Sequence, residues 1–440
     1  MTGPGFDRHH PPDAALIADC VHCGFCLPTC PTYLLWGLEP DSPRGRIDLM
    51  DGVLQRQIGL TPATVDHFDN CLGCLACVSA CPSGVQYGRL IEQTRAQLER
   101  NAPRTAGDRL FRWLIFQLFP YPDRLRALLP ALRLYRQSGI RAAVQRAGLL
   151  ARLPERLQAM ESLTPPLPPA LVRPLPTRTP PQRMLRLRVG LLTGCVQQVF
   201  FQHVNEATIR VLAAEGCEVI VPPQGCCGAL ELHAGREPGA LRRARALISA
   251  LEGADRIVVN AAGCGSSMKE YGTLLADDRR WAGRAARFSA KVRDVSEILA
   301  ELEPIATYQP LPLSVAYQDA CHLQHAQGVR LQPRAVLGRV PGLRLAEVRE
   351  PEICCGSAGV YNLLVPQPAR ELGDRKAAAV LATGADALAS ANPGCLIQIQ
   401  SALSRVGRSL PVFHPIELID ASIRGERVDA LLAGRPGKAG

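Results

Sequence analysis

Two matching runs of cysteine constrain this chain more than any other feature. Both have the spacing C-x₂-C-x₂-C-x₃-C and are followed by a proline. The runs are Cys20, Cys23, Cys26, Cys30 before Pro31, and Cys71, Cys74, Cys77, Cys81 before Pro82. This spacing places three thiolates on a tight loop and a fourth before a proline, where we expect a helix to begin, and it is typical of two-cluster [4Fe–4S] sites. We therefore predict that the chain holds two [4Fe–4S] clusters and transfers electrons.

The same pattern predicts crossed ligation, because the fourth cysteine of each run ligates the cluster of the other run. One predicted set is Cys20, Cys23, Cys26 and Cys81; the other is Cys71, Cys74, Cys77 and Cys30. Structural zinc is the first alternative, but zinc favours paired C-x-x-C knuckles with four ligands per ion. Disulfides are the second, and they require an oxidising compartment. We predict no catalytic residue and no further cofactor-binding residue.

Composition and charge limit the compartment and the partners that we expect for this chain. The start, Met1–Asp13, is polar and proline-rich and resembles no secretory signal, so the 17 cysteines favour metal chemistry in a reducing cytoplasm. The longest apolar stretch, Trp113–Phe119, is too short to span a bilayer. The net charge of +10 comes mostly from arginines on one helical stretch. That distribution suits an anionic membrane surface or an acidic subunit, and we predict no nucleic-acid partner.

The stretch in question, residues 104–157, is predicted to form basic amphipathic helices. Two interpretations stay open: packed helices with a solvated arginine face, or a surface that lies on the membrane near quinones. The arginines are Arg109, Arg112, Arg124, Arg126, Arg133, Arg136, Arg141 and Arg146. A proline-rich, extended connector from Pro165 to Pro181 follows.

The remainder contains an internal repeat of short apolar runs that end at cysteines. Each copy has a single cysteine, a Cys-Cys-Gly and another single cysteine: Cys195, Cys226, Cys227, Cys264, and Cys321, Cys354, Cys355, Cys395. Apolar runs alternate with helical stretches, which predicts two α/β units with parallel sheets. Cysteines just past the strands would meet at the carboxyl edge of each sheet. We leave open whether these thiols bind metal or are only structural.

For several residues near these motifs, the sequence favours no single function. Cys217 fits neither cysteine pattern and is expected to be a small buried hydrophobe. His233, His322 and His325 lie beside the motifs, and either structural roles or proton handling fits them. No Gly-rich dinucleotide fingerprint occurs, so no flavin or nicotinamide site is predicted.

These observations predict an α+β multidomain protein. A helical ferredoxin-like domain (residues 1–103) would be followed by basic helices and a linker (104–185) and by two repeated parallel-sheet cysteine-rich units (186–305 and 306–440).

Both motif sets together make the chain resemble the iron–sulfur subunits of glycolate oxidase (glycolate dehydrogenase). The likeness includes Ser42-Pro43-Arg44-Gly45-Arg46, Gln224-Gly225-Cys226-Cys227-Gly228 and Asp319-Ala320-Cys321-His322-Leu323. The repeats also resemble the cysteine-rich CCG domain of heterodisulfide reductases, without its closing C-x-x-C. The resemblance implies a hetero-oligomer in which flavin-containing subunits oxidise glycolate to glyoxylate. This chain would carry the electrons to a quinone-type acceptor, in the cytoplasm or peripherally on the inner face of the membrane.

Three alternative functions remain at this stage. The chain could be the iron–sulfur subunit of a lactate or glycerol-3-phosphate dehydrogenase, which share this layout. A heterodisulfide-reductase-like thiol–disulfide enzyme is the second, although the missing C-x-x-C counts against it. The third is a basic scaffold with structural metal, which reducible iron–sulfur EPR signals would eliminate.

Overall fold

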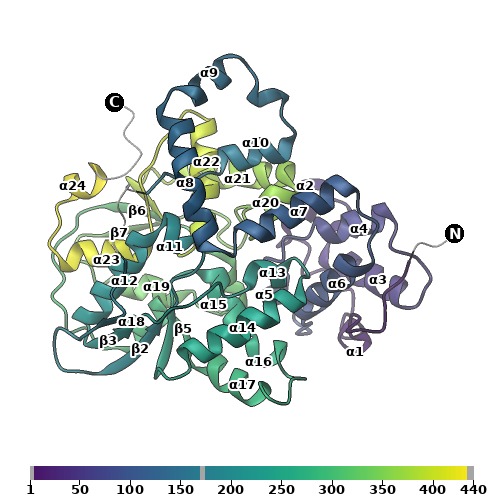
Figure 1. Cartoon of the computed structure of the whole chain (residues 1–440), viewed down its shortest axis with the longest axis horizontal. Helices are drawn as coiled ribbons and strands as arrows, with labels where there is room; N and C mark the ends of the chain where they lie inside the picture. The colour runs from purple at the N-terminus through teal and green to yellow at the C-terminus, as the bar shows by residue number, and fades with distance from the viewer. Residues whose placement is uncertain (1–3, 169–173, 434–440) are drawn as a thin grey trace.

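The computed structural model describes residues 4–168 and 174–433, so Pro169 of the predicted connector lies outside the described part. The N-terminal region is helical, as predicted (Figure 1). Its α-helices are α1 (Ala14–Ala18), α2 (Pro31–Trp36), α3 (Pro43–Leu54), α4 (Pro62–Asp69), α5 (Ala76–Ala80) and α6 (Tyr87–Asn101). They enclose an apolar core in which Met50, Phe68 and Leu90 are fully buried.

Local sequence explains where these helices begin. Ser42 caps α3 by accepting a hydrogen bond from the Gly45 amide, and Thr61 caps α4 in the same way, each with a proline at the first helical position. Cys30 immediately precedes α2, as predicted for the fourth cysteine of a run. Cys81 differs, because it ends α5 and a turn separates it from α6. The prediction that this cysteine also starts a helix is therefore wrong.

The basic stretch forms helices, as predicted. They are α7 (Ala106–Leu118), α8 (Pro122–Gln137), α9 (Ile140–Arg146) and α10 (Glu155–Ser162). Figure 1 shows α8, α9 and α10 rising above the rest of the molecule, while α7 runs back toward the N-terminal helices. Ile115 and Phe116 of α7 anchor this layer against Val360 and Leu363.

The first α/β unit is built on a mixed sheet of five strands in the order β1-β3-β2-β4-β5. The strands are β1 (Arg178–Thr179), β2 (Leu187–Leu191), β3 (Cys217–Ile220), β4 (Arg256–Val259) and β5 (Val292–Asp294). All pairs are parallel except the edge strand β1, which pairs antiparallel with β3 and lies in the predicted connector. The helices between the strands are α11 (Gln197–Phe200), α12 (Gln202–Ala214), α13 (Ala229–His233), α14 (Glu237–Leu251), α15 (Ala262–Lys269), α16 (Tyr271–Leu274) and α17 (Ala282–Lys291); α18 (Val295–Glu301) follows β5.

The second α/β unit repeats this plan with four parallel strands in the order β7-β6-β8-β9. The strands are β6 (Ser314–Tyr317), β7 (Arg344–Glu347), β8 (Ala387–Ala389) and β9 (Val412–Phe413). Its helices are α19 (Leu331–Leu337), α20 (Tyr361–Leu364), α21 (Pro366–Leu381), α22 (Pro393–Arg405), α23 (Pro415–Ile423) and α24 (Val428–Ala433). In both units the parallel strands lie in the order second, first, third, fourth. The strand order therefore reverses between the first and third parallel strands. Open α/β sheets place their sites at that point.

The two α/β units share one apolar core. Val189, Val219 and Val258 of the first sheet belong to the same buried cluster as Val315 and Leu388 of the second. Helix α12 packs on α23, and Arg210 of α12 forms an ion pair of 2.7 Å with Asp420 of α23. The two repeats therefore pack directly against each other.

Candidate iron–sulfur centres

The structure places the eight predicted ligands around two cavities. The first cavity encloses about 420 Å³ with its open mouth and is lined by Cys20, Cys23, Cys26, Cys77 and Cys81. The second measures about 310 Å³ together with its open mouth and is lined by Cys30, Cys71, Cys74 and Cys77. Each predicted crossed set thus lines one cavity, and Cys77 borders both. We name them the outer and the inner cavity.

The two cavities have different access to solvent. In the outer cavity Cys23 is exposed and Cys20, Cys26 and Cys81 are half-buried. All four predicted ligands of the inner cavity are buried. Val21 and Phe25 on the outer cysteine loop are 67% and 64% exposed, so this loop faces solvent with an apolar tip.

Backbone conformation lets both loops wrap tightly. Gly24 and Gly73 have φ of 84° and 65°, a region that L-residues rarely adopt. A Cβ at either position would come within 2.9 Å of an arginine, Arg44 at Gly24 and Arg95 at Gly73. Each arginine binds its own loop: Arg44 donates to the carbonyl of His22 at 2.9 Å, and Arg95 donates to the carbonyl of Cys71. Matching glycine–arginine pairs therefore fix the two loops.

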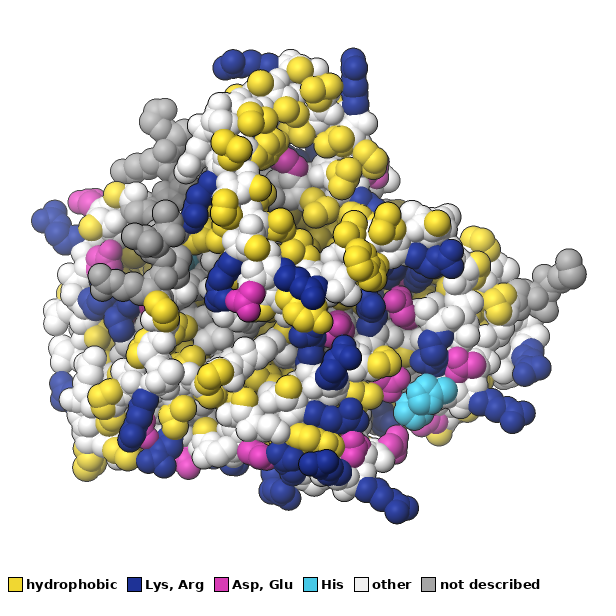
Figure 2. All heavy atoms as spheres, in the orientation of Figure 1, with side chains coloured by type: hydrophobic (Ala, Val, Ile, Leu, Met, Phe, Trp, Pro, Cys, Tyr) yellow, Lys and Arg dark blue, Asp and Glu magenta, His cyan; other side chains and the backbone are white. Residues whose placement is uncertain are grey.

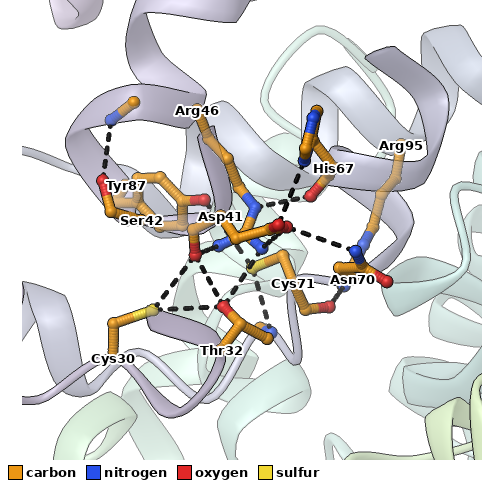
Figure 3. A network of polar contacts seen from close by, with 12 residues as sticks. Cys30, Thr32, Asp41, Ser42, Arg46, His67, Asn70, Cys71, Tyr87 and Arg95 are labelled. Carbon is orange, nitrogen blue, oxygen red and sulfur yellow. Dashed lines mark hydrogen bonds and ion pairs between the residues drawn. The ribbon is translucent and has the colours of Figure 1, made fainter. Parts of the chain in front are cut away.

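A buried polar network lies on the inner side (Figure 3). Arg46, which is fully buried, donates to the backbone carbonyl and the carboxylate of Asp41 at 2.7 and 3.1 Å and to Thr32 Oγ1 at 3.1 Å. Thr32 Oγ1 lies 3.3 Å from Cys30 Sγ. The Tyr87 hydroxyl donates to Cys71 Sγ at 3.6 Å. Arg46 is thus linked to Cys30 through Thr32, and Tyr87 contacts the second predicted ligand, Cys71.

The inner-cavity charges also act on the thiols. Burial alone would raise the pKa of Cys71, but the positive charges of Arg46 and Arg95, together with hydrogen bonds from the Gly73 amide and the Tyr87 hydroxyl, hold this pKa below its ordinary value. Burial raises the pKa of Cys74 and Cys77 well above the ordinary value, and it raises that of Cys26 in the outer cavity. The cations thus favour a thiolate at Cys71, the state that a metal ligand requires.

Sequence reasoning missed the roles of Arg46 and Tyr87. A signal was present for Arg46, since it shares one helical stripe with Met50 and Val53, four and seven residues later, which are both buried. An arginine on a buried stripe is costly unless it is paired, so its position pointed to an internal partner.

The repeat cysteines gather at the carboxyl edges of the two sheets, as predicted. In the first unit the thiols of Cys195, Cys226, Cys227 and Cys264 form a chain of neighbouring contacts. In the second unit Cys321 Sγ lies 3.8 Å from Cys354 Sγ, and Cys355 links this pair to Cys395. We name these groups the first and second thiol quartets. The second quartet lies beside the inner cavity, because Cys354 packs in the same buried cluster as Cys74.

The other residues singled out from the sequence have the following surroundings. Cys217 is fully buried at the start of β3, as expected. The rings of His233 and His322 lie in tilted contact with centroids 5.0 Å apart, and burial lowers the pKa of His322 to about 3. His325 Nδ1 lies 2.9 Å from the Ser79 hydroxyl, which links the second unit to α5.

The basic helices pack on the rest of the chain through some of their arginines. Arg112 is buried against Asp69 and Asp108, and Arg136 donates to the carbonyls of Thr164 and Pro165, so these arginines pack internally. The outer face instead exposes apolar side chains, which Figure 2 shows gathered over the upper part of the molecule. They include Leu110, Trp113, Leu114, Leu128, Leu134, Ile140, Leu149, Leu153 and Leu157. Within residues 4–168 and 174–433, none of the helices combines the length and apolarity needed to cross a bilayer.

Three family models match the chain. A 4Fe-4S dicluster domain matches residues 17–85, the linker region of the glycolate oxidase iron-sulfur subunit matches residues 107–164, and a cysteine-rich domain matches residues 189–269 and 315–400. These matches support iron–sulfur clusters as the cofactors.

Curated relatives align over nearly the whole chain. The probable glycolate oxidase iron-sulfur subunit of Bacillus subtilis is 38% identical, covering 90% of this chain and 91% of the relative. The glycolate oxidase iron-sulfur subunit of Escherichia coli is 37% identical, covering 94% and 95%. Lactate utilization protein A of Bacillus cytotoxicus is 28% identical, covering 53% of this chain and 99% of that protein. With its cysteine cavities, its linker helices and its two cysteine-rich units, the chain belongs to the glycolate oxidase iron–sulfur subunit family.

Proposed function

We propose that this chain is the electron-transfer subunit of a glycolate-oxidising complex. Flavin-containing subunits would oxidise glycolate to glyoxylate, and this chain would pass the electrons to a quinone-type acceptor. The observation that carries the proposal is the pairing of each crossed cysteine set with one cavity. Cys20, Cys23, Cys26 and Cys81 would hold one [4Fe–4S] cluster, and Cys30, Cys71, Cys74 and Cys77 the other. Clusters of this kind accept and donate single electrons.

The surroundings of the two cavities give the transfer a direction. Hydrogen bonds to sulfur, local positive charge and burial tune cluster potentials. The inner cavity has the hydrogen bond from Tyr87 and the buried cation Arg46, which stabilise the more negative, reduced state. The outer cavity opens to solvent beside the exposed Val21 and Phe25, where a donor subunit has access. Electrons would therefore enter at the outer cavity and move to the inner one.

Two preparations test this proposal. The anaerobically purified full chain should contain about eight irons, four per cluster, and show reducible EPR signals. It should not oxidise glycolate alone, and reduction of a dye at the expense of glycolate should begin only when the flavin subunits are added. Glycolate oxidation by the isolated chain, or zinc as its sole metal, would contradict the proposal.

Lactate is the second candidate substrate of the complex, because lactate utilization protein A aligns with part of the chain. The reconstituted complex distinguishes the two substrates. We expect kcat/KM for glycolate to exceed that for lactate, and the reverse order would move the chain to the lactate systems.

We also propose a peripheral association of α7–α10 with the inner face of the membrane. The exposed apolar side chains would enter the interface, and the exposed Arg109 and Arg146 would face anionic headgroups. Sedimentation with anionic vesicles should fall with salt and in an R109Q/R146Q variant. Equal binding to neutral vesicles would remove the electrostatic part of this proposal.

A further inference from the structure

Three side chains with metal-ligand chemistry meet where the start of the chain crosses the first α/β unit. His9 and His10 lie in the segment of residues 4–13 that precedes α1, which we name the arm. Glu237 is the first residue of α14. Each side chain offers one ligand atom, and the three atoms lie within 4.8 Å of one another. This group, which we name the arm cluster, contains no cysteine, so it is separate from the cysteine cavities and the thiol quartets.

The distances within the arm cluster suit a single metal ion. Glu237 Oε1 lies 3.2 Å from His10 Nδ1, and Glu237 Oε2 lies 3.8 Å from His9 Nε2. Zinc binds nitrogen and oxygen ligands at about 2.0–2.1 Å, so two ligands of one tetrahedral zinc lie about 3.3 Å apart. The observed separations are close to this value. Two imidazoles and one carboxylate are also a ligand set that zinc prefers.

The charges around Glu237 leave room for a cation. Its side chain is only 17% exposed, and within residues 4–168 and 174–433 its ion-pair partners are the two histidines. The neighbouring Arg236 pairs with Glu99 instead. The rings of His9 and His10 stack with centroids 4.3 Å apart, and two parallel rings this close cannot both carry a positive charge at low cost. A divalent ion would supply the charge that this carboxylate lacks.

The second ring nitrogen of His10 has the partner that a metal ligand needs. Asp277 Oδ2 lies 3.7 Å from His10 Nε2, on the other side of the ring from Glu237. Histidines that bind a metal through one nitrogen usually direct the other N–H toward a carboxylate or a carbonyl, which fixes the tautomer. With its proton on Nε2, His10 directs the lone pair of Nδ1 toward Glu237 and the ion.

The arm is held in place by α6. Gln97 and Arg100 of this helix donate to the carbonyl of His9 at 2.9 and 2.6 Å. Arg100 also forms an ion pair of 2.8 Å with Asp7. The backbone that carries the two histidines is therefore fixed before any ion binds.

The loop before α14 packs on the same helix. Gly235 has a φ of 80°, and a Cβ at this position would collide with the carbonyl of Arg95 in α6. Only glycine allows this close approach, which brings Glu237 to the arm. Because α6 supports both segments, the three ligands are prepositioned, and binding an ion costs little ordering of the chain.

We propose that the arm cluster binds one zinc ion through His9 Nε2, His10 Nδ1 and a carboxylate oxygen of Glu237, with water at the fourth position. The ion joins the arm to the first α/β unit across α6. It transfers no electron and uses no thiol, so the site does not depend on the proposed function. Protons compete with zinc for the imidazoles, and zinc therefore dissociates as the pH falls below about 6.

Equilibrium dialysis of the anaerobic full chain, with its clusters bound, tests the site. We expect H9Q/H10Q to bind one zinc fewer per chain than the wild type, and E237Q to raise the Kd of that zinc at least tenfold, on the order of the effects known for groups that support metal ligands. X-ray absorption at the zinc edge identifies the ligands, because nitrogen and oxygen lie at about 2.0–2.1 Å and thiolate sulfur at about 2.3 Å. The variants should lose only the nitrogen and oxygen component.

The matched control is H203Q. His203 is 43% exposed and lies 3.5 Å from the buried carboxylate of Glu417, but it belongs to no group of three ligands in the described part of the chain. H203Q should bind zinc as the wild type does. Equal zinc content and equal spectra in H9Q/H10Q, E237Q and H203Q would overturn the proposal. So would a Kd in the millimolar range for the wild type, which would indicate an adventitious ion only.

Proteolysis tests whether the ion holds the arm. Arg8 is exposed and directly precedes His9, so trypsin can cleave between them when the arm opens. Zinc at ten times its Kd should slow this cleavage about tenfold in the wild type and in H203Q. It should have no effect in H9Q/H10Q, which also controls for any action of zinc on the protease. Zinc binding without slower cleavage would overturn the joining role of the ion.

Discussion

The outer and inner cavities come from the same C-x₂-C-x₂-C-x₃-C-P pattern, yet their surroundings differ. The outer cysteine loop has exposed Val21 and Phe25, whereas the inner loop is covered by the second α/β unit, with Leu72 and Cys74 packed on Ile353 and Cys354. In the described part of the chain, the buried network around Arg46 lies at the inner cavity. The motif therefore specifies which cluster is built, and the tertiary neighbours specify its exposure and potential.

This difference in exposure predicts different roles for the two identical cysteine motifs. An exposed centre can meet a partner subunit, but it cannot keep water away. We expect the hydrogen bond to Cys71 and the charge of Arg46, which Asp41 offsets in part, to stabilise a reduced inner cluster. The following experiments test the contrast, beginning with the largest expected effect.

Crossed ligation gives the largest effect, because a lost ligand removes a whole cluster. C30S should remove the inner cluster, and C81S should remove the outer one. The double variant C30S/C74S should lose no more than either single variant, since both residues serve the inner cavity. C30S/C26S should lose both clusters. Iron content and EPR spectra measure the result, and C30S/C26S retaining one cluster would show that ligation is not crossed.

Arg46 should affect stability more than any surface arginine. R46M leaves the carboxylate of Asp41, which is 2% exposed, without its buried cation, at a cost of about 3 kcal/mol in the free energy of unfolding. The matched control is R126M, because Arg126 pairs with a 94% exposed Asp123 and should contribute little. Urea unfolding of the anaerobic full chain gives both values. Equal midpoints for the two variants would show that the inner network does not stabilise this region.

The eight cysteines that the sequence predicts as ligands line the two cavities, and their local spacing was sufficient to single them out. The sequence also predicted the repeated α/β units, since strands such as Arg256–Val259 are short apolar runs that lead directly to the cysteines. It did not predict β1, because Arg178–Thr179 lies among prolines and becomes a strand only by pairing with Val219 and Ile220. Contacts formed between distant segments determine such elements.

The same limit applies to the candidate sites. Arg46 gave a local signal, but its role depends on Asp41 and on the inner loop. The packing of the second thiol quartet beside the inner cavity gave no signal, because Cys354 and Cys74 come from separate regions of the chain. Sequence spacing thus predicts a site on one loop, and it does not predict a site made where domains meet.

Access to solvent should separate the two clusters kinetically. A water-soluble ferrous chelator, added anaerobically, should remove about half of the iron in a fast phase and the rest slowly, because only the outer cavity has an exposed ligand, Cys23. C81S should lack the fast phase and C30S the slow one. A single phase, or the opposite assignment, would mean that exposure in the free chain does not control iron loss.

The smallest effect concerns the hydrogen bond from Tyr87 to Cys71. This donor stabilises the reduced inner cluster, so Y87F should lower the inner potential, and a bond of about 0.5–1 kcal/mol corresponds to about 20–40 mV for one electron. Y33F is the control, because Tyr33 lies on α2 and donates no hydrogen bond to a cysteine in the part of the chain described here. Anaerobic redox titration followed by EPR resolves the two clusters. A shift in the outer potential instead of the inner one would reverse the assignment of the two cavities, and no shift in either would remove Tyr87 from the explanation of their difference.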